Sequence, residues 1–233
     1  MCIRDRYSEN TAILSGDAMS ILAFKYLAAG KSARLQEILT LFSKTALEVC
    51  EGQQLDMNFE TRSDVTIAEY LGMIRLKTAV LIACSLKIGA LMADGDLAQA
   101  DLLYEYGINL GLAFQLQDDW LDVYGDPNVF GKMQGGDICA NKKTYLLLKA
   151  TEASDPALLL ELNHWLLKSD FDPIQKIAVI SAIYEKTGVS KATQNLMQGY
   201  HDKALQALEK MAVPTHFKET LAAFAGEAMA RVK

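Results

Sequence analysis

The sequence predicts an all-α fold. Long windows rich in alanine and leucine carry apolar residues at helical spacing, and no sustained alternation of apolar and polar residues predicts a strand. Hydrophobic residues make up 51% of the 233 residues, enough for one sizeable core. The four prolines, Pro127, Pro156, Pro173 and Pro214, each fall where a helix should begin or a loop should run. We therefore expect one helical domain over residues 7–233.

The helical spacing predicts nine helices. Gly30, Gly95 and Gly188 mark three of their boundaries, because glycine is favoured where a helix ends. Ser63 or Asp64 is the expected N-cap of the third helix, since short polar side chains accept hydrogen bonds from first-turn amides. The expected helices cover residues 10–29, 32–55, 64–93, 96–124, 141–152, 156–168, 172–187, 189–211 and 215–231.

Two segments fall outside this helical pattern. Residues 125–140 contain Asp-Pro-Asn at 126–128 and Gly-Gly-Asp at 135–137, which predicts a long loop. A loop of that length inside a compact domain is usually functional. Residues 1–6 carry three charges and no apolar helical face. We interpret them as an artefact of the gene model, or a disordered start, joined to a truncated reading frame.

Composition excludes several classes of protein. The formal net charge of -6 argues against a general nucleic-acid binder, which needs a basic surface. The four cysteines form no C-x-x-C pair and are accompanied by three histidines, so we expect no zinc site. Nothing resembles a signal peptide, and the most apolar stretch, residues 79–93, is interrupted by Lys87. A membrane helix needs about 20 apolar residues, so we expect a cytoplasmic protein without a transmembrane segment.

The strongest functional signal is a run of aspartates in the fourth expected helix. With about 100° per residue, Gln115, Asp118, Asp119 and Asp122 fall within an arc of roughly 100°, and the remaining surface there is apolar. Three like charges at this spacing repel one another and are costly near a core. A hard divalent cation, which prefers carboxylate oxygens, would remove that conflict. The pattern favours a metal site, and a solvated acidic helix face is the alternative.

Three further segments fit a metal–diphosphate site, although each has a simpler explanation. The loop that includes Lys132, together with Lys142 after it, is rich in glycine and lysine, which suit close approach to phosphate. A surface loop with solvated lysines is the alternative. Lys77 precedes an apolar run and would equally extend from a helix surface into solvent. Gln53 and Asp56 share a helix face, as a polar cluster at a helix end also would.

Taken together, these segments resemble the trans-isoprenyl diphosphate synthase (polyprenyl synthetase) family, which makes farnesyl, geranylgeranyl and longer polyprenyl diphosphates. The order and spacing fit from about residue 7 to the C-terminus. Residues 10–17 resemble the family segment that follows its first aspartate-rich helix, and Gln115 to Asp122 resemble its second aspartate-rich motif. The other resembling segments are Gly52-Gln53 with Asp56, Lys77-Thr78-Ala79, and the loop residues Lys132, Gly136, Asp137 and Lys142.

The resemblance implies an isoprenoid synthase-type bundle of antiparallel helices around a central cavity, usually as a homodimer. It also implies Mg²⁺-dependent condensation of isopentenyl diphosphate with an allylic diphosphate to give a longer isoprenyl diphosphate. By this resemblance, the metal ligands would be Asp118, Asp119 and Asp122, and the metal site would be supported by Gln53 and Asp56. The allylic diphosphate would be bound by Lys77, Lys132 and Lys142. The catalytic residues would be Lys77, Thr78 and Gln115, of which Thr78 and Gln115 would face the developing allylic cation.

One part of the family pattern is absent. The first D-D-x-x-D and the arginine-rich loop after it belong upstream of Asn10, where Asp5 and Glu9 are the only acidic residues. We therefore expect an N-terminally truncated copy that lacks the first helices of the bundle and binds isopentenyl diphosphate and metal incompletely. A non-catalytic partner subunit of a heteromeric prenyltransferase, a terpene cyclase-like enzyme and a ligand-free helical scaffold are the alternatives. Lys142-Lys143-Thr144 and the Gly-Lys loop favour chain elongation over cyclisation.

Overall fold

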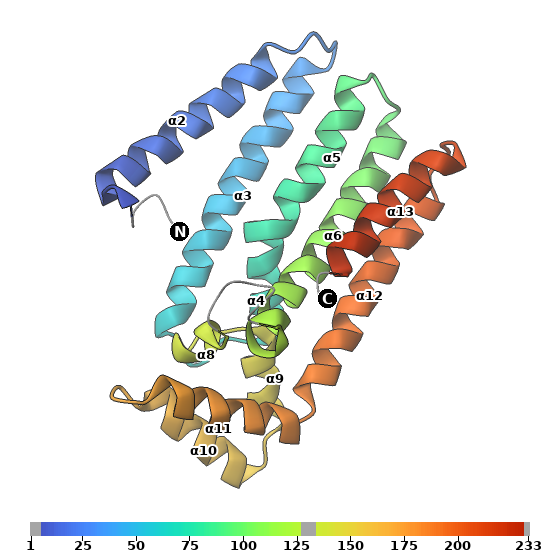
Figure 1. Ribbon diagram of the computed structural model, residues 1–233. Helices are drawn as coiled ribbons and strands as arrows, with labels where there is room; N and C mark the ends of the chain where they lie inside the picture. The colour runs from blue at the N-terminus through green and yellow to red at the C-terminus, as the bar shows by residue number, and fades with distance from the viewer. Residues whose placement is uncertain (1–5, 127–133, 231–233) are drawn as a thin grey trace.

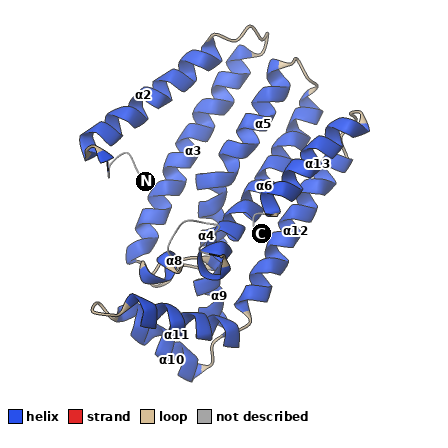
Figure 2. Ribbon diagram, in the orientation of Figure 1, coloured by secondary structure: helices blue, strands red, loops and turns tan. Residues whose placement is uncertain are grey.

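Helices form all the regular structure in the part of the chain that the computed structural model describes, residues 6–126 and 134–230 (Figures 1 and 2). The all-α prediction is confirmed. The elements are α2 (Glu9–Ala28), α3 (Leu35–Thr61), α4 (Ile67–Ile74), the π-helix η1 (Arg75–Ala79), α5 (Val80–Met92), α6 (Leu97–Tyr124), α8 (Gly136–Cys139), α9 (Tyr145–Ala153), α10 (Pro156–Leu167), α11 (Pro173–Lys186), α12 (Val189–Glu209) and α13 (Thr215–Met229).

The long helices lie side by side, with α6 between α5 and α12 and with α3 against α5 (Figure 1). Helix α2 packs against α3 at one edge of this array, and α13 packs against α6 and α12. Helices α10 and α11 cross the end of the bundle at which α6 finishes and α8 begins (Figure 1). None of the helices in the described ranges is long and apolar enough to cross a membrane.

The N-terminus of α4 differs from the expected one. Its N-cap is Thr66, whose hydroxyl accepts from the backbone N–H of Glu69 at 3.2 Å, while the Glu69 carboxylate accepts from the Thr66 N–H at 2.9 Å. The prediction of Ser63 or Asp64 as the cap was wrong. The T-x-x-E spacing of a capping box was readable in the sequence, and it satisfies two first-turn donors where a single side chain would satisfy one.

Other boundaries were predicted with mixed success. Pro156 begins α10, as expected, and Pro173 begins α11, one residue after the predicted start; Asp155 and Asp172 cap these helices. The helix predicted over residues 32–55 continues to Thr61, and the one predicted over 141–152 begins only at Tyr145. The segment 125–140 was expected to be entirely non-helical, yet Gly136–Cys139 forms α8. Of that segment, residues 127–133 lie outside the described part of the chain.

The segment η1 is held between α3 and α6 by close backbone contacts. A Cβ on Gly52 of α3 would lie 2.4 Å from the backbone nitrogen of Lys77, and one on Gly111 of α6 would lie 2.5 Å from the Cα of Ala79. The neighbouring backbones therefore approach as closely as glycine allows. The sequence predicts one continuous helix here, whereas the structure contains a π-helical turn, a feature that often occurs at functional sites. This turn carries Lys77 and Thr78.

Candidate functional site

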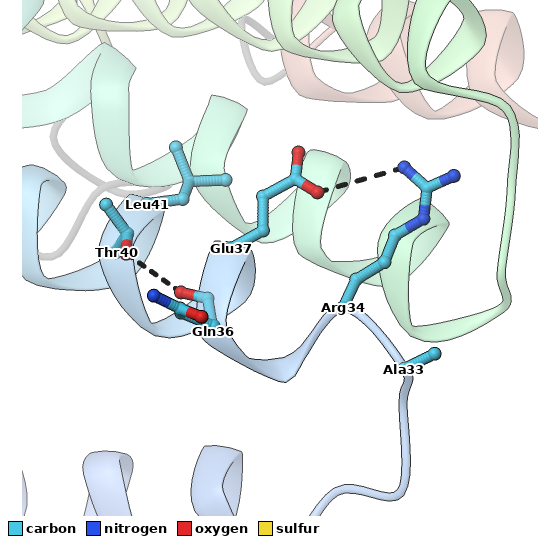
Figure 3. A pocket seen from close by; sticks show the side chains of 6 residues that line it. All are labelled: Ala33, Arg34, Gln36, Glu37, Thr40 and Leu41. Carbon is cyan, nitrogen blue, oxygen red and sulfur yellow. Dashed lines mark hydrogen bonds and ion pairs between the residues drawn. The ribbon is translucent and has the colours of Figure 1, made fainter.

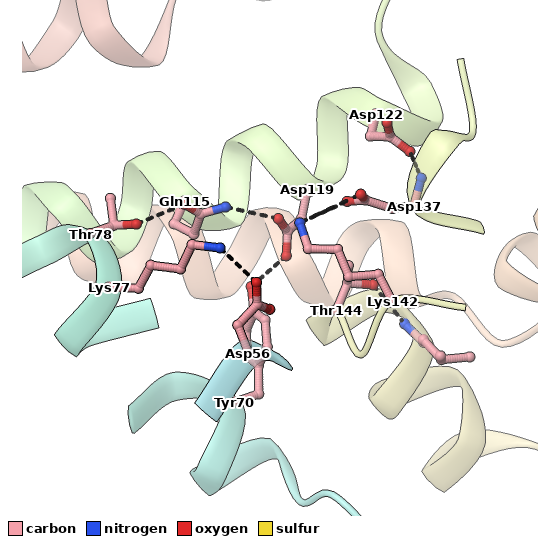
Figure 4. Close-up of polar contacts among 11 residues, drawn as sticks. Asp56, Tyr70, Lys77, Thr78, Gln115, Asp119, Asp122, Asp137, Lys142 and Thr144 are labelled. Carbon is pink, nitrogen blue, oxygen red and sulfur yellow. Dashed lines mark hydrogen bonds and ion pairs between the residues drawn. The ribbon is translucent and has the colours of Figure 1, made fainter. Parts of the chain in front are cut away.

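Charged side chains from five segments meet beside the C-terminal half of α6 (Figure 4). They are Asp56 of α3, Lys77 of η1, Asp119 of α6, Asp137 of α8 and Lys142 of the loop after α8. Four of these positions were expected to be functional from the sequence. The structure brings them together from parts of the chain that are far apart, which a plain solvated helix face would not require.

Asp119 is the buried member of the aspartate run, with 3% of its surface exposed. Its Oδ2 accepts a hydrogen bond from the Tyr70 hydroxyl at 2.6 Å, and its Oδ1 accepts from Gln115 Nε2 at 3.0 Å. Burial raises the pKa of Asp119 to about 6, against the opposing effects of the Lys142 charge and of these hydrogen bonds. Asp119 is therefore oriented by its neighbours. In the stripe of carboxylates that Asp118, Asp119 and Asp122 form along α6, it is the member that lies deepest in the protein.

Asp118 and Asp122 face outward from the same helix. Asp118 is exposed and Asp122 is half-buried. The Asp122 carboxylate accepts from the backbone N–H of Asp137 at 2.9 Å, which ties α8 to α6. Burial raises the pKa of Asp137, and the negative charges of Asp122 and Asp118 raise it further, while Lys142 opposes the shift. Asp137 therefore belongs to the same group of carboxylates.

The carboxylates do not form a complete metal cage by themselves. Within residues 6–126 and 134–230, no group of three Asp, Glu, His or Cys side chains is placed to hold an ion. This arrangement still fits Mg²⁺, which usually keeps several waters and binds through one or two carboxylates plus substrate phosphates. Asp118 and Asp122 supply hard oxygen donors at the outer surface of α6, so they are the residues that would hold the ion together with a diphosphate.

The lysines of the site lie among these carboxylates. Lys77 Nζ is 2.6 Å from Asp56 Oδ2, and Lys142 Nζ is 3.5 Å from the carboxylate of Asp137. Burial tends to lower the pKa of Lys142, but the negative charges of Asp119, Asp137 and Asp56 outweigh that effect, so its pKa is raised. Lys142 is thus held in its charged form. Lys132, the third predicted lysine, lies outside the described residues.

A chain of hydrogen bonds runs from η1 into α6. The Thr78 hydroxyl donates to Gln115 Oε1 at 2.9 Å, and the amide nitrogen of Gln115 donates to Asp119. This fixes which end of the Gln115 amide points towards Thr78 (Figure 4). Gln53 lies outside these hydrogen bonds. It is exposed, and its side chain makes no hydrogen bond with the described part of the protein, whereas Asp56 on the same helix pairs with Lys77.

Two residues of this site were not predicted to act in it. Tyr70 sits on α4 in an apolar stretch, and no local pattern in the sequence marks its hydroxyl as a partner for Asp119. Asp137 was predicted only as part of the loop, although its position beside two glycines and near lysines was a sequence signal for a site residue.

A hollow of about 530 Å³ at the start of α3 lies at the opposite end of the bundle from α8 (Figures 1 and 3). It contains none of the predicted residues.

Comparisons with known proteins support the sequence resemblance. A family model described as Polyprenyl synthetase matches residues 1–186. Geranylfarnesyl diphosphate synthase of Natronomonas pharaonis is 41% identical over 152 residues, covering 64% of this chain and 45% of that protein. The chain therefore spans about half the length of the curated relatives it matches.

Solved structures have the same fold. A crystal structure of geranylgeranyl pyrophosphate synthase matches with a TM-score of 0.92 at 42% identity, covering 99% of this chain and 72% of the other. Geranylgeranyl pyrophosphate synthase from Corynebacterium glutamicum, solved in complex with isoprenyl diphosphate and magnesium, matches with a TM-score of 0.85 at 30% identity. That match covers 95% of this chain and 63% of the other.

Proposed function

This chain belongs to the polyprenyl synthetase family, and from that membership we propose that it serves in Mg²⁺-dependent prenyl transfer. In this reaction isopentenyl diphosphate is condensed with an allylic diphosphate to give a longer isoprenyl diphosphate. The observation that carries the proposal is the gathering of lysines and carboxylates beside α6, where Lys142 lies near Asp137 and Asp119 and Lys77 pairs with Asp56. The magnesium and isoprenyl diphosphate present in the Corynebacterium glutamicum relative support it.

The residues divide into two groups around a diphosphate. Asp118 and Asp122 would hold Mg²⁺, which when bound would neutralise the negative charge that develops on the departing diphosphate. Lys77 and Lys142 would contact the diphosphate oxygens directly as point charges. In the described structure both lysines are paired with aspartates. A diphosphate would therefore compete with Asp56 and Asp137 for them, and we expect binding to depend on Mg²⁺ to shield these acids.

Thr78 and Gln115 have a different role in the proposal. As the allylic carbon–oxygen bond breaks, its electrons leave with the diphosphate and a carbocation forms. The hydroxyl oxygen of Thr78 and the amide oxygen of Gln115, held 2.9 Å apart, would place partial negative charge beside that cation. The double bond of isopentenyl diphosphate supplies the electrons for the new carbon–carbon bond, and a proton is then lost. The apolar sides of α6 would keep water from the cation.

Calorimetry with a non-reactive allylic diphosphate analogue tests the binding step. We expect binding in the presence of Mg²⁺, and weaker binding after Asp118→Asn, which removes a metal ligand that is exposed and so is not needed for packing. Asp202→Asn is the matched control, because Asp202 is an exposed helix aspartate on α12 that Gln198 contacts. Equal affinity of the Asp118 variant and the parent would make the stripe a solvated acidic face.

An elongation assay separates the proposed reaction from its alternatives. Labelled isopentenyl diphosphate, a short allylic primer and Mg²⁺ should give longer labelled products. Consumption of the primer without incorporation of isopentenyl diphosphate would indicate a cyclase. Binding of the analogue without either reaction would indicate a non-catalytic partner subunit. The family resemblance also leads us to propose that the protein is a homodimer located in the cytoplasm. Light scattering would test the dimer.

A further inference from the structure

Lys176 of α11 is a buried lysine without an acidic partner among the described residues. It is 0% exposed and forms no ion pair with any carboxylate in the described part of the chain. Its Nζ donates to Asn141 Oδ1 at 2.7 Å and lies 3.4 Å from the Cys139 carbonyl oxygen, with the Phe171 ring centroid 4.0 Å away. Burying an ammonium group among neutral partners is costly. An apolar side chain would fill the same space at lower cost, so the contact to Asn141 needs an explanation.

Asn141 has an unusual backbone conformation. Its φ is +53°, in the left-handed region that, apart from glycine, mainly asparagine and aspartate adopt. Its side chain is held from two sides, because Lys176 donates to Oδ1 while Nδ2 donates to the Leu166 carbonyl at 2.9 Å. Helices α10 and α11 thus fix both ends of one amide. Contacts from outside the loop therefore hold the side chain of the residue that forms the left-handed turn.

This turn determines where the next side chain points. Directly after Asn141, the Lys142 backbone N–H donates to the Asp137 carbonyl at 3.0 Å, and the Lys142 side chain returns to within 3.5 Å of the Asp137 carboxylate. A right-handed residue at position 141 would send the chain in another direction and take Lys142 away from Asp137 and Asp119. The orientation of Lys142 is thus linked to Asn141, and through it to Lys176.

We propose that Lys176 is a positioning residue for the diphosphate site: through Asn141 it fixes the left-handed turn that directs Lys142 into the acidic cluster. The amine acts on the turn and makes no contact with the ligand itself. The turn is a property of the folded chain, whereas its effect on diphosphate binding rests on the function proposed above. The two parts therefore need separate measurements.

Amide hydrogen exchange tests the turn without any ligand. Lys176→Met removes the amine and keeps a long side chain that fills the space. Exchange at residues 137–144 should become faster in this variant, while exchange in α12 stays unchanged. Adding Asn141→Gly should restore slow exchange at the Lys142 amide, because glycine adopts positive φ without side-chain support.

If Lys176→Met does not fold, Asn141→Ala, which removes the acceptor and leaves the lysine, should show the same faster exchange. Unchanged exchange in the variant that folds would overturn the proposal.

Analogue binding tests the consequence of the turn. Lys176→Met should weaken Mg²⁺-dependent binding about tenfold or more, as loss of a supporting contact to a ligand group typically does. Asn141→Gly in the same chain should recover it, which a purely structural role of Lys176 would not predict. Lys149→Met is the control, since Lys149 is paired with Glu152 at the protein surface. Faster exchange with unchanged affinity would overturn the positioning role. A parent chain that binds no analogue would refute the proposed function alone, and the exchange data would still decide whether Lys176 holds the turn.

Discussion

The hydroxyl of Tyr70 donates a 2.6 Å hydrogen bond to the buried carboxylate of Asp119, joining α4 to α6. Burial and the neighbouring negative charge of Asp119 raise the pKa of Tyr70 well above its ordinary value, so the phenol keeps its proton and remains the donor. Asp119 accepts a second bond from Gln115, which in turn accepts from Thr78. One buried carboxylate therefore fixes the orientation of groups on both sides of the site.

Tyr70→Phe should lower the free energy of unfolding by about 2 kcal/mol, because hydrogen bonds to charged groups contribute about 1.5–3 kcal/mol. Urea unfolding measures the change. Tyr106→Phe is the control, since the Tyr106 hydroxyl donates to the neutral Leu221 carbonyl at 2.8 Å and its loss should cost only about 1 kcal/mol. A loss for Tyr70→Phe no larger than that for Tyr106→Phe would contradict a charged acceptor at Asp119.

The raised pKa of Asp119 predicts a specific pH dependence of stability. The pKa is about 6 in the folded protein against an ordinary value of 3.8. Between these values the folded state binds more protons than the unfolded state, so the contribution of Asp119 to stability falls as pH rises from about 4 to about 6. Its full size is on the order of 3 kcal/mol, since a tenfold change in proton affinity corresponds to about 1.4 kcal/mol.

Asp119→Asn should therefore remove the part of the stability profile that falls between pH 4 and 6. Urea unfolding of parent and variant across pH 4–7 provides the comparison, and the difference between the two curves is the informative quantity. Asp64→Asn is the control, because Arg62 holds the pKa of Asp64 below its ordinary value and that contribution is lost only as pH falls further. Parallel curves for the parent and Asp119→Asn would exclude the raised pKa.

Much of this site follows from local sequence patterns, and the limits of those patterns explain the rest. Helical periodicity depends on neighbours in the chain, so it correctly predicted that Gln115, Asp118, Asp119 and Asp122 share one face. It gave the three aspartates equal standing, because how deeply a position on the stripe is buried depends on which other helices pack there. The structure distinguishes buried Asp119, which α4 contacts through Tyr70, from exposed Asp118.

Contacts between distant segments were outside the reach of the sequence patterns. The π-helical turn at Arg75–Ala79 has no local signature, because a continuous helix and a helix with one wider turn place apolar residues almost identically. The burial of Lys176 likewise results from the packing of α11 against α8. By contrast, the N-cap at Thr66 is encoded locally, because Glu69 three residues later completes a capping box.

Lys142→Ala should abolish most of the rise in melting temperature that pyrophosphate plus Mg²⁺ gives the parent chain. The variant should also lose some stability without ligand, because Lys142 offsets the charges of Asp119 and Asp137. The ligand-induced shift is therefore the measurement that reports on binding. Lys149→Ala, which removes a surface ion pair with Glu152, should keep the full shift. A full shift in the Lys142 variant would remove this lysine from the diphosphate site.

Gly52→Ala should disturb both packing and ligand binding. The added Cβ would lie 2.4 Å from the Lys77 backbone nitrogen and 2.8 Å from the Leu76 carbonyl carbon. Both are backbone atoms of η1, which α6 contacts closely on its other side, so no flexible side chain can move aside. Overpacking of this kind typically costs about 1–3 kcal/mol, and we expect the upper part of that range. Any outward shift of η1 would also move Lys77 from Asp56 and Thr78 from Gln115.

Gly199→Ala is the matched control for this substitution. Gly199 lies in the interior of α12 and has nothing within 4 Å of the Cβ position, so alanine there should stabilise the helix by about 1 kcal/mol through its higher helix propensity. Urea unfolding should thus give opposite signs for the two glycines, and calorimetry should show weaker analogue binding only for Gly52→Ala. If Gly52→Ala were neutral or stabilising, the tight contact between α3 and η1 would not exist, and the placement of Lys77 would need another explanation.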